Sequence, residues 1–172
     1  MTKAFSWRTA TRADLPRIVE IYNRTIPTRM VTADLEPVSV ESREAWFALH
    51  VPGFRPLWVS ELNGHVAAWL SFSSFYGRPA YDGTAEVSLY VDYPHQRGGL
   101  GSYLLTEAMR ESPALQIRTL LAFVFGHNAP SLKLFQRHGF ETWGTLPGVA
   151  VLDAEERDLV ILGCRPAGQA GS

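Results

Sequence analysis

Apolar and polar residues alternate along this chain in two periods, one typical of helices and one typical of strands. Thr11 and Asp14 have the positions of an N-cap and of a capping-box acid, and apolar residues follow them at helical spacing. These residues are Leu15, Ile18, Val19 and Tyr22. A second helix is expected over residues 40–50, opened by Ser39 or Glu41, and residues 23–40 between the two helices are irregular.

Strand patterns dominate the rest of the chain. Asn63 and Gly64 are a two-residue hairpin signal between the apolar segments 56–62 and 65–73. Further strands are expected over residues 5–9, 84–91, 119–125, 141–148 and 157–164, and further helices over residues 99–111 and 131–138. Helices that alternate with strands in the middle, with a hairpin at each flank, predict an α/β fold with a mixed sheet and helices on both faces.

Composition and charge exclude several classes of protein. The chain has 172 residues, 46% hydrophobic and 19% charged, so we expect one domain over residues 1–165 and a disordered tail over residues 166–172. A formal net charge of −1 gives no support for a nucleic-acid or membrane partner. The single Cys164 excludes an internal disulfide, and no Cys/His array predicts a metal site. Without a long apolar run or a signal peptide, a cytoplasmic protein is expected.

The most informative segment is a glycine-rich turn between a predicted strand and a predicted helix. Its residues are Gln96, Arg97, Gly98, Gly99, Leu100, Gly101 and Ser102. Such a turn leaves backbone N–H groups free at the positive end of a helix dipole, which suits a phosphate. The sequence has no Gly-Lys-Ser/Thr string for a P-loop. It also has no acid at the end of the next strand, Gly126-His127-Asn128, for a dinucleotide.

The turn fits a third pattern, Gln/Arg-x-x-Gly-x-Gly/Ala, at Gln96, Gly99 and Gly101. That pattern resembles the pyrophosphate-binding motif of the GNAT acetyltransferase family. The segment from Asn128 to Phe140, about 30 residues later, resembles the Asn-led helix of the same family. The resemblance implies acetyl-CoA as co-substrate. It also implies a mostly antiparallel sheet of about seven strands that splays between its central parallel strands to admit the pantetheine arm.

The resemblance also assigns cofactor contacts. It implies that residues 96–102 hold the pyrophosphate, that backbone groups of Leu89, Tyr90 and Val91 face the thioester, and that Asn128 and Ser131 contact the pantetheine or adenosine end. Phe135 stands where many family members have a tyrosine that protonates the leaving thiolate. Phenylalanine cannot donate a proton, so Tyr103, Tyr90, His138 and solvent are the alternative acids.

The candidate general base is Glu86, which lies among apolar residues on a predicted strand. Partial desolvation there would raise the pKa of the carboxyl towards that of a working base. The alternative is a glutamate that faces water on an edge strand. Because side chains alternate along a strand, Glu86, Ser88 and Tyr90 are expected on one face.

The nearest resemblance, over residues 5–164, is to the phosphinothricin/methionine sulfoximine acetyltransferase branch of the family. It implies that Glu86 is the base and that an arginine and aromatic residues hold an anionic acceptor. The substrate-binding candidates are Ile26, Phe75, Arg78 and Tyr81. Arg78 is about as compatible with a solvated loop charge. The chain also lacks the branch's aromatic residue near Asp153, and position 135 is commonly histidine in the branch.

The sequence therefore predicts an N-acetyltransferase that moves acetyl from acetyl-CoA to the primary amine of a small amino-acid-like molecule by direct attack. The resemblance is compatible with a homodimer. One alternative keeps the fold but takes a protein N-terminus or a lysine as acceptor, which requires an open groove. Another is a non-catalytic acetyl-CoA-binding protein, which the replacement at Phe135 would allow.

Overall fold

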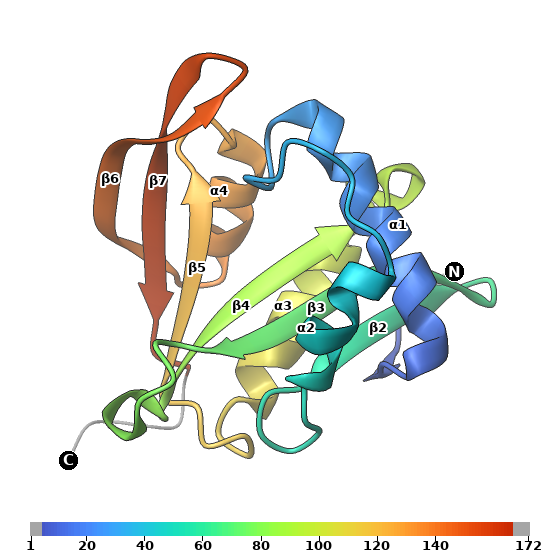
Figure 1. The fold of residues 1–172 in the computed structure, drawn as a ribbon. Helices are drawn as coiled ribbons and strands as arrows, with labels where there is room; N and C mark the ends of the chain where they lie inside the picture. The colour runs from blue at the N-terminus through green and yellow to red at the C-terminus, as the bar shows by residue number, and fades with distance from the viewer. Residues whose placement is uncertain (1–4, 167–172) are drawn as a thin grey trace.

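The computed structural model describes residues 5–166, which form a seven-stranded mixed sheet covered by helices on both faces (Figure 1). The helices are α1 (Leu15–Thr25), α2 (Glu44–Ala48), α3 (Leu100–Glu111) and α4 (Ala129–Arg137). The strands are β1 (Trp7–Thr9), β2 (Leu57–Leu62), β3 (His65–Ser74), β4 (Thr84–Val91), β5 (Thr119–Phe125), β6 (Glu141–Leu152) and β7 (Glu155–Cys164). Nearly all of the predicted tail lies outside the described residues.

Most predicted elements are confirmed, although several differ in extent; β1 starts two residues later and α4 two residues earlier than predicted. The predicted helix over residues 40–50 is a 3-10 turn, Glu41–Arg43, followed by the short helix α2. Strand β6 continues past its predicted end at residue 148 because a bulge between Leu146 and Ala150 lets the pairing with β7 resume. β7 starts two residues early because Asp153 and Ala154, both with positive φ, complete the hairpin turn between β6 and β7.

The sheet is antiparallel except at its centre. The strand order is β1-β2-β3-β4-β5-β7-β6, and only the β4–β5 pair is parallel. That pair ends at Glu86 and Leu121, whereas β4 stays paired with β3 as far as Val91. β4 and β5 therefore diverge beyond Glu86 (Figure 1), which confirms the expected splay.

Each face of the sheet has its own hydrophobic core. The larger core packs Leu104 and Leu105 of α3 and Phe135 of α4 against one face. The smaller core packs Ile18 and Ile21 of α1 against the other face. No helix within residues 5–166 is long and apolar enough to cross a membrane.

Candidate active site

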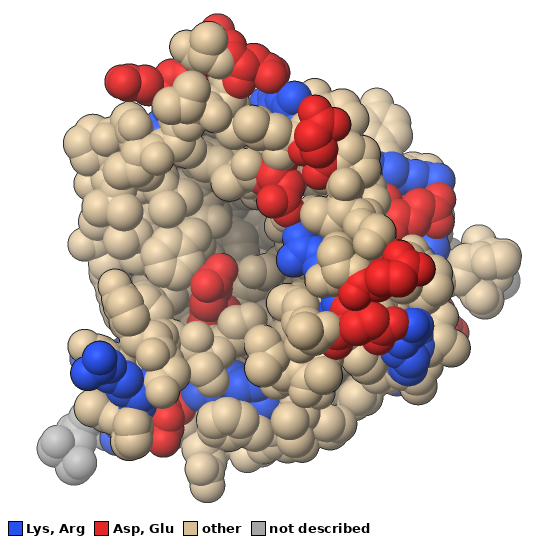
Figure 2. Space-filling model, in the orientation of Figure 1, with Lys and Arg blue, Asp and Glu red and all other residues tan. Residues whose placement is uncertain are grey.

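A cavity of about 200 Å³ lies between the sheet and the two N-terminal helices. Figure 2 shows the hollow on this face, with acidic and basic side chains at its edge. The floor is formed by residues of β3 and β4, and the walls by residues of α1, of α2 and of the segments beside them. The floor residues are Trp69, Ser71, Ser73, Glu86, Ser88 and Tyr90. Two of the lining residues are charged, Glu86 and Arg43.

Glu86 projects into this cavity from the fourth of the seven strands, so it is not an edge-strand residue. It pairs with Ser73 on β3 and with Leu121 on β5, at the point where β4 and β5 separate. Burial raises the pKa of the Glu86 carboxyl above its ordinary value, and the Ser88 hydroxyl beside it acts in the opposite direction. Ser88 and Tyr90 share the cavity face with Glu86, as strand alternation predicts.

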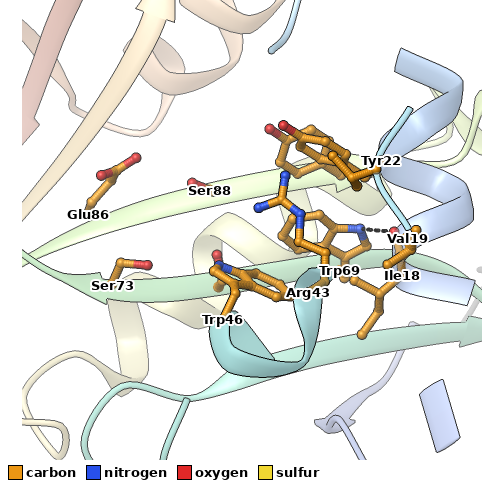
Figure 3. Close-up of a pocket in the computed structure, with 12 residues that line it drawn as sticks. Ile18, Val19, Tyr22, Arg43, Trp46, Trp69, Ser73, Glu86 and Ser88 are labelled. Atoms are coloured by element: carbon orange, nitrogen blue, oxygen red, sulfur yellow. Dashed lines mark hydrogen bonds between the residues drawn. The ribbon is translucent and has the colours of Figure 1, made fainter. Parts of the chain in front are cut away.

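The sequence reasoning missed the second charged residue, Arg43, which reaches the cavity from the 3-10 turn before α2 (Figure 3). Its guanidinium carbon lies 4.7 Å from the centre of the Tyr22 ring and 6.0 Å from that of the Trp46 ring. Its Nη2 donates to Asp34 Oδ2 at 2.9 Å. The signal in the sequence for this wall was the spacing of Arg43 and Trp46. Residues three apart place their side chains on one face of a helix.

A cluster of aromatic rings closes the end of the cavity near Arg43. Tyr90 stacks on Trp69 with ring centres 4.3 Å apart, and Tyr22 contacts Tyr90 at 5.2 Å. Burial raises the pKa of the Tyr90 hydroxyl, which therefore stays protonated at neutral pH. Of the three side chains considered as alternative acids, Tyr90 is the one that lines the cavity.

Beyond Glu86, β4 presents an open edge towards β5. Asp92 N–H donates to Ala67 O at 2.8 Å, and the β3–β4 register runs without a bulge. In an antiparallel pair the backbone N–H and C=O groups of every second residue point away from the partner strand. Leu89 and Val91 are the residues whose backbone groups face the opening, whereas those of Tyr90 face β3. The opening therefore offers two N–H groups to a ligand placed between the strands.

The glycine-rich turn follows directly and leads into α3. Arg97 and Gly99 both have positive φ, 62° and 88°, and Gly99 is the N-cap of α3. The first bond of the helix runs from Tyr103 N–H to Gly99 O at 2.9 Å, so the amides of residues 97–102 precede it. A Cβ on Gly101 would touch Leu89 at 3.4 Å, which shows how closely this turn packs on β4.

A buried carboxylate, which the sequence reasoning also missed, anchors this turn to α1. Asp92 lies between β4 and the turn, is 3% exposed, and accepts hydrogen bonds from Arg17 and Arg24 at 2.5 and 2.8 Å. It also accepts from Tyr93 N–H at 3.0 Å. Burial raises the pKa of Asp92, but the hydrogen bonds from Arg24 and Arg17 outweigh it and hold the pKa below its ordinary value. The two arginines, seven residues apart on one face of α1, were the signal in the sequence.

The Asn-led helix has the predicted cap. Asn128 Oδ1 accepts from Ser131 N–H at 3.2 Å, and Asn128 Nδ2 donates to Met30 O at 2.9 Å. Asn128 thus ties the segment after α1 to the start of α4. Phe135 is 6% exposed and packs against Phe140 in the core. Its assignment as a cofactor contact stays a prediction.

The four predicted substrate residues lie outside the lining of the cavity. The Phe75 and Tyr81 rings lie with their centres 5.4 Å apart on the loop between β3 and β4, and Arg78 is exposed on the same loop. Ile26 is 2% exposed and belongs to the interior. Being close in sequence to Glu86 therefore does not bring Arg78 into the cavity that contains Glu86.

The described residues contain no group of three or more His, Cys, Asp or Glu side chains that could hold a metal ion. The open strand edge and the phosphate-suited turn together match a cofactor that lies between β4 and β5. The model of the acetyltransferase (GNAT) family matches residues 15–140. The chain belongs to this family.

Curated relatives and solved structures agree with the assignment to an N-acetyltransferase family. YwnH of Bacillus subtilis, named provisionally as a phosphinothricin acetyltransferase, is 58% identical over 91% of this chain and 96% of its own length. An L-methionine sulfoximine/L-methionine sulfone acetyltransferase of Pseudomonas paraeruginosa is 32% identical over 84% of each chain. The yncA protein of Salmonella typhimurium, solved with its cofactor acetyl-CoA, superposes with a TM-score of 0.89 at 29% identity and covers 98% of each chain.

Proposed function

We propose that this GNAT acetyltransferase transfers acetyl from acetyl-CoA to the primary amine of a small amino-acid-like acceptor, with Glu86 as general base. The observation that carries the proposal is the position of Glu86, in the cavity and at the point where β4 and β5 separate. An acceptor in the cavity and a thioester in the opening would meet at this point. The relatives named for methionine sulfoximine and for phosphinothricin support the class of acceptor.

The proposed chemistry assigns a task to each part of the site. The amides of residues 97–102 bind the pyrophosphate, and Asn128 and Ser131 contact the pantetheine or adenosine end. The N–H groups of Leu89 and Val91 are placed to stabilise the oxyanion that forms on the thioester carbonyl. Glu86 takes the proton from the attacking amine, directly or through a water molecule. The thiolate then leaves as the tetrahedral intermediate collapses.

Direct attack requires no enzyme nucleophile. Cys164 is buried, and its burial raises the pKa of the thiol to about 12, so a thiolate is not available at neutral pH. The volume of the cavity, about 200 Å³, is below the ~300–1,000 Å³ typical of drug-sized ligands. This small volume favours a single amino-acid-sized acceptor over the N-terminus or a lysine of a protein.

The test replaces Glu86 and follows thiol release from acetyl-CoA across pH. We expect Glu86→Gln to lower kcat/KM by about 10²–10³-fold and to leave the affinity for acetyl-CoA unchanged. In the parent protein, kcat/KM should rise with pH through the raised pKa of Glu86, and this limb should vanish in the variant. Glu141→Gln, at an exposed glutamate of β6, is the matched control. Normal turnover by Glu86→Gln at every pH would overturn the proposal.

A suitable acceptor panel contains methionine sulfoximine, methionine sulfone, phosphinothricin, free amino acids, polyamines and a short peptide. Turnover with amino-acid analogues alone supports the proposed class. Preferential turnover of the peptide would instead favour the protein-acceptor alternative. Acetyl-CoA binding without turnover of any amine would favour the non-catalytic alternative.

A further inference from the structure

We infer that Arg43 binds the α-carboxylate of the acceptor, so that the cavity selects zwitterionic α-amino acids through a residue outside the loop of residues 75–83. The inference deepens the proposed function and rests on it. Figure 3 shows Glu86 and Ser88 on one strand and the Arg43 guanidinium at the Tyr22 end of the same cavity. The inference follows from the hydrogen bonds, rigidity and position of this guanidinium.

The first observation is the unused hydrogen-bonding capacity of Arg43. A guanidinium has five N–H donors. Within the described residues, Arg43 makes one side-chain hydrogen bond, from Nη2 to Asp34, and lines the cavity. By contrast, Arg17 and Arg24 each bond both Asp92 and Glu20. Arg43 therefore keeps donors for a bidentate interaction with a ligand carboxylate.

The second observation is that the guanidinium is held in place before any ligand arrives. It lies against the Tyr22 and Trp46 rings, and the Trp46 ring itself packs on Trp69 at 5.6 Å. The Asp34 carboxylate accepts a hydrogen bond from Nη2 and so fixes one edge of the guanidinium, and the Tyr22 hydroxyl donates to the same carboxylate. A guanidinium held in this way loses little rotamer entropy on binding, which strengthens its interaction with a ligand.

The third observation is charge complementarity across the cavity. The two charged lining residues have opposite signs, and Glu86 comes from the floor of the cavity whereas Arg43 comes from the wall beside α2. An α-amino acid carries an amine and a carboxylate on one carbon. If its amine is presented towards Glu86 and the opening at Leu89, its carboxylate turns towards Arg43. The hydroxyls of Ser71, Ser73 and Ser88 on the floor add neutral polar partners between the two ends.

The test compares acceptors that differ only in the carboxylate. Free L-amino acids and their α-carboxamides are acetylated by the parent protein and by Arg43→Gln, Arg43→Lys, Arg78→Gln and Arg110→Gln. We expect Arg43→Gln to raise the KM for the acids by about 10- to 100-fold and to leave that for the carboxamides within about twofold. The KM of Arg43→Lys for the acids should lie between those of the parent and of Arg43→Gln, because lysine keeps the charge but not the planar fork of the guanidinium. Arg78→Gln tests the loop arginine as the rival carboxylate site. Arg110→Gln, at an exposed arginine of α3 outside the lining of the cavity, is the matched control and should match the parent.

Two results would overturn the inference. One is an equal loss with acids and carboxamides in Arg43→Gln, which would indicate a structural role alone. The other is a loss specific to the acids in Arg78→Gln but not in Arg43→Gln. A thermal shift of the parent protein by amino acids, absent in Arg43→Gln, measures binding without turnover. If acetyl transfer fails with every amine, this shift still supports the Arg43 site, and its absence from the parent contradicts it.

Discussion

Replacement of Asp92 should show how strongly α1 holds the glycine-rich turn. Asp92→Ala removes the acceptor of four hydrogen bonds, three of them from the guanidinium groups of Arg17 and Arg24. A bond to a charged group contributes about 1.5–3 kcal/mol. The summed contribution of these hydrogen bonds to stability is reduced here because the Arg24 side chain is 47% exposed and both arginines keep Glu20 as a partner. We therefore expect a loss of about 2–4 kcal/mol in the free energy of unfolding.

Urea unfolding measures this loss directly, and a thermal scan should show a fall in Tm of roughly 6–12 °C for a chain of this size. The matched control is Glu20→Gln, which touches the same two arginines from an exposed position and should cost less than about 0.5 kcal/mol. Because the turn follows Asp92 directly, the KM for acetyl-CoA should rise in Asp92→Ala. Equal stabilities of Asp92→Ala and Glu20→Gln would refute the reasoning.

The pH dependence gives a second measurement of the same interaction. The pKa of Asp92 is held below its unfolded value, so its charge stabilises the fold fully above that value and progressively less as the pH falls through the folded pKa. The stability difference between the parent and Asp92→Asn should therefore be constant from neutral pH to about pH 5 and shrink below about pH 4. A difference that grew on acidification would contradict the assignment of the charged form.

Two further predictions concern the C-terminal strands. Gly163→Ala should destabilise by about 1–2 kcal/mol in urea unfolding, because the new Cβ would lie 2.2 Å from the half-exposed Trp143 ring and force it aside. Gly144→Ala, whose Cβ would meet Ile161 at an ordinary 3.7 Å, is the control, and equal stability of the two variants would contradict this packing. Cys164 should resist a thiol reagent such as Ellman's at pH 8 in the folded protein and react once the chain is unfolded. Rapid labelling of the folded protein would show that the thiol is accessible.

The parts of the fold that sequence reasoning predicts are those with a local physical cause. Asn63 and Gly64 both have positive φ and make the predicted hairpin turn, and Gly99 begins α3 as expected. Glu86 could be singled out because strand alternation gives its face and its apolar neighbours indicate burial. The splay itself came from the resemblance to a family, since no local pattern shows where two parallel strands separate.

The end of the cavity near Arg43 could not be predicted, because it depends on how α2 docks over the sheet. Arg43 and Trp46 belong to a short helical segment with no buried residue of its own, so its sequence pattern carries little information. Arg78 was a candidate because the resemblance to the acetyltransferase branch implies an arginine and an aromatic residue in the segment before Glu86. The 3-10 turn Pro79–Tyr81 separates Arg78 from Glu86, and the structure puts Arg78 on the exposed loop instead.

The short β4–β5 junction also divides the domain mechanically. Within residues 5–166, three residue pairs are the whole of the strand pairing between β1–β4 and β5–β7. The two parts of the sheet should therefore open as separate units in native-state hydrogen exchange, linked by α3, which lies between β4 and β5 in the chain, and by the larger hydrophobic core, which contains residues of both parts. A ligand that spans the junction would couple the two units, so that amides on both sides gain protection together. Occupancy of the opening would then be visible in the dynamics of strands that never touch the ligand.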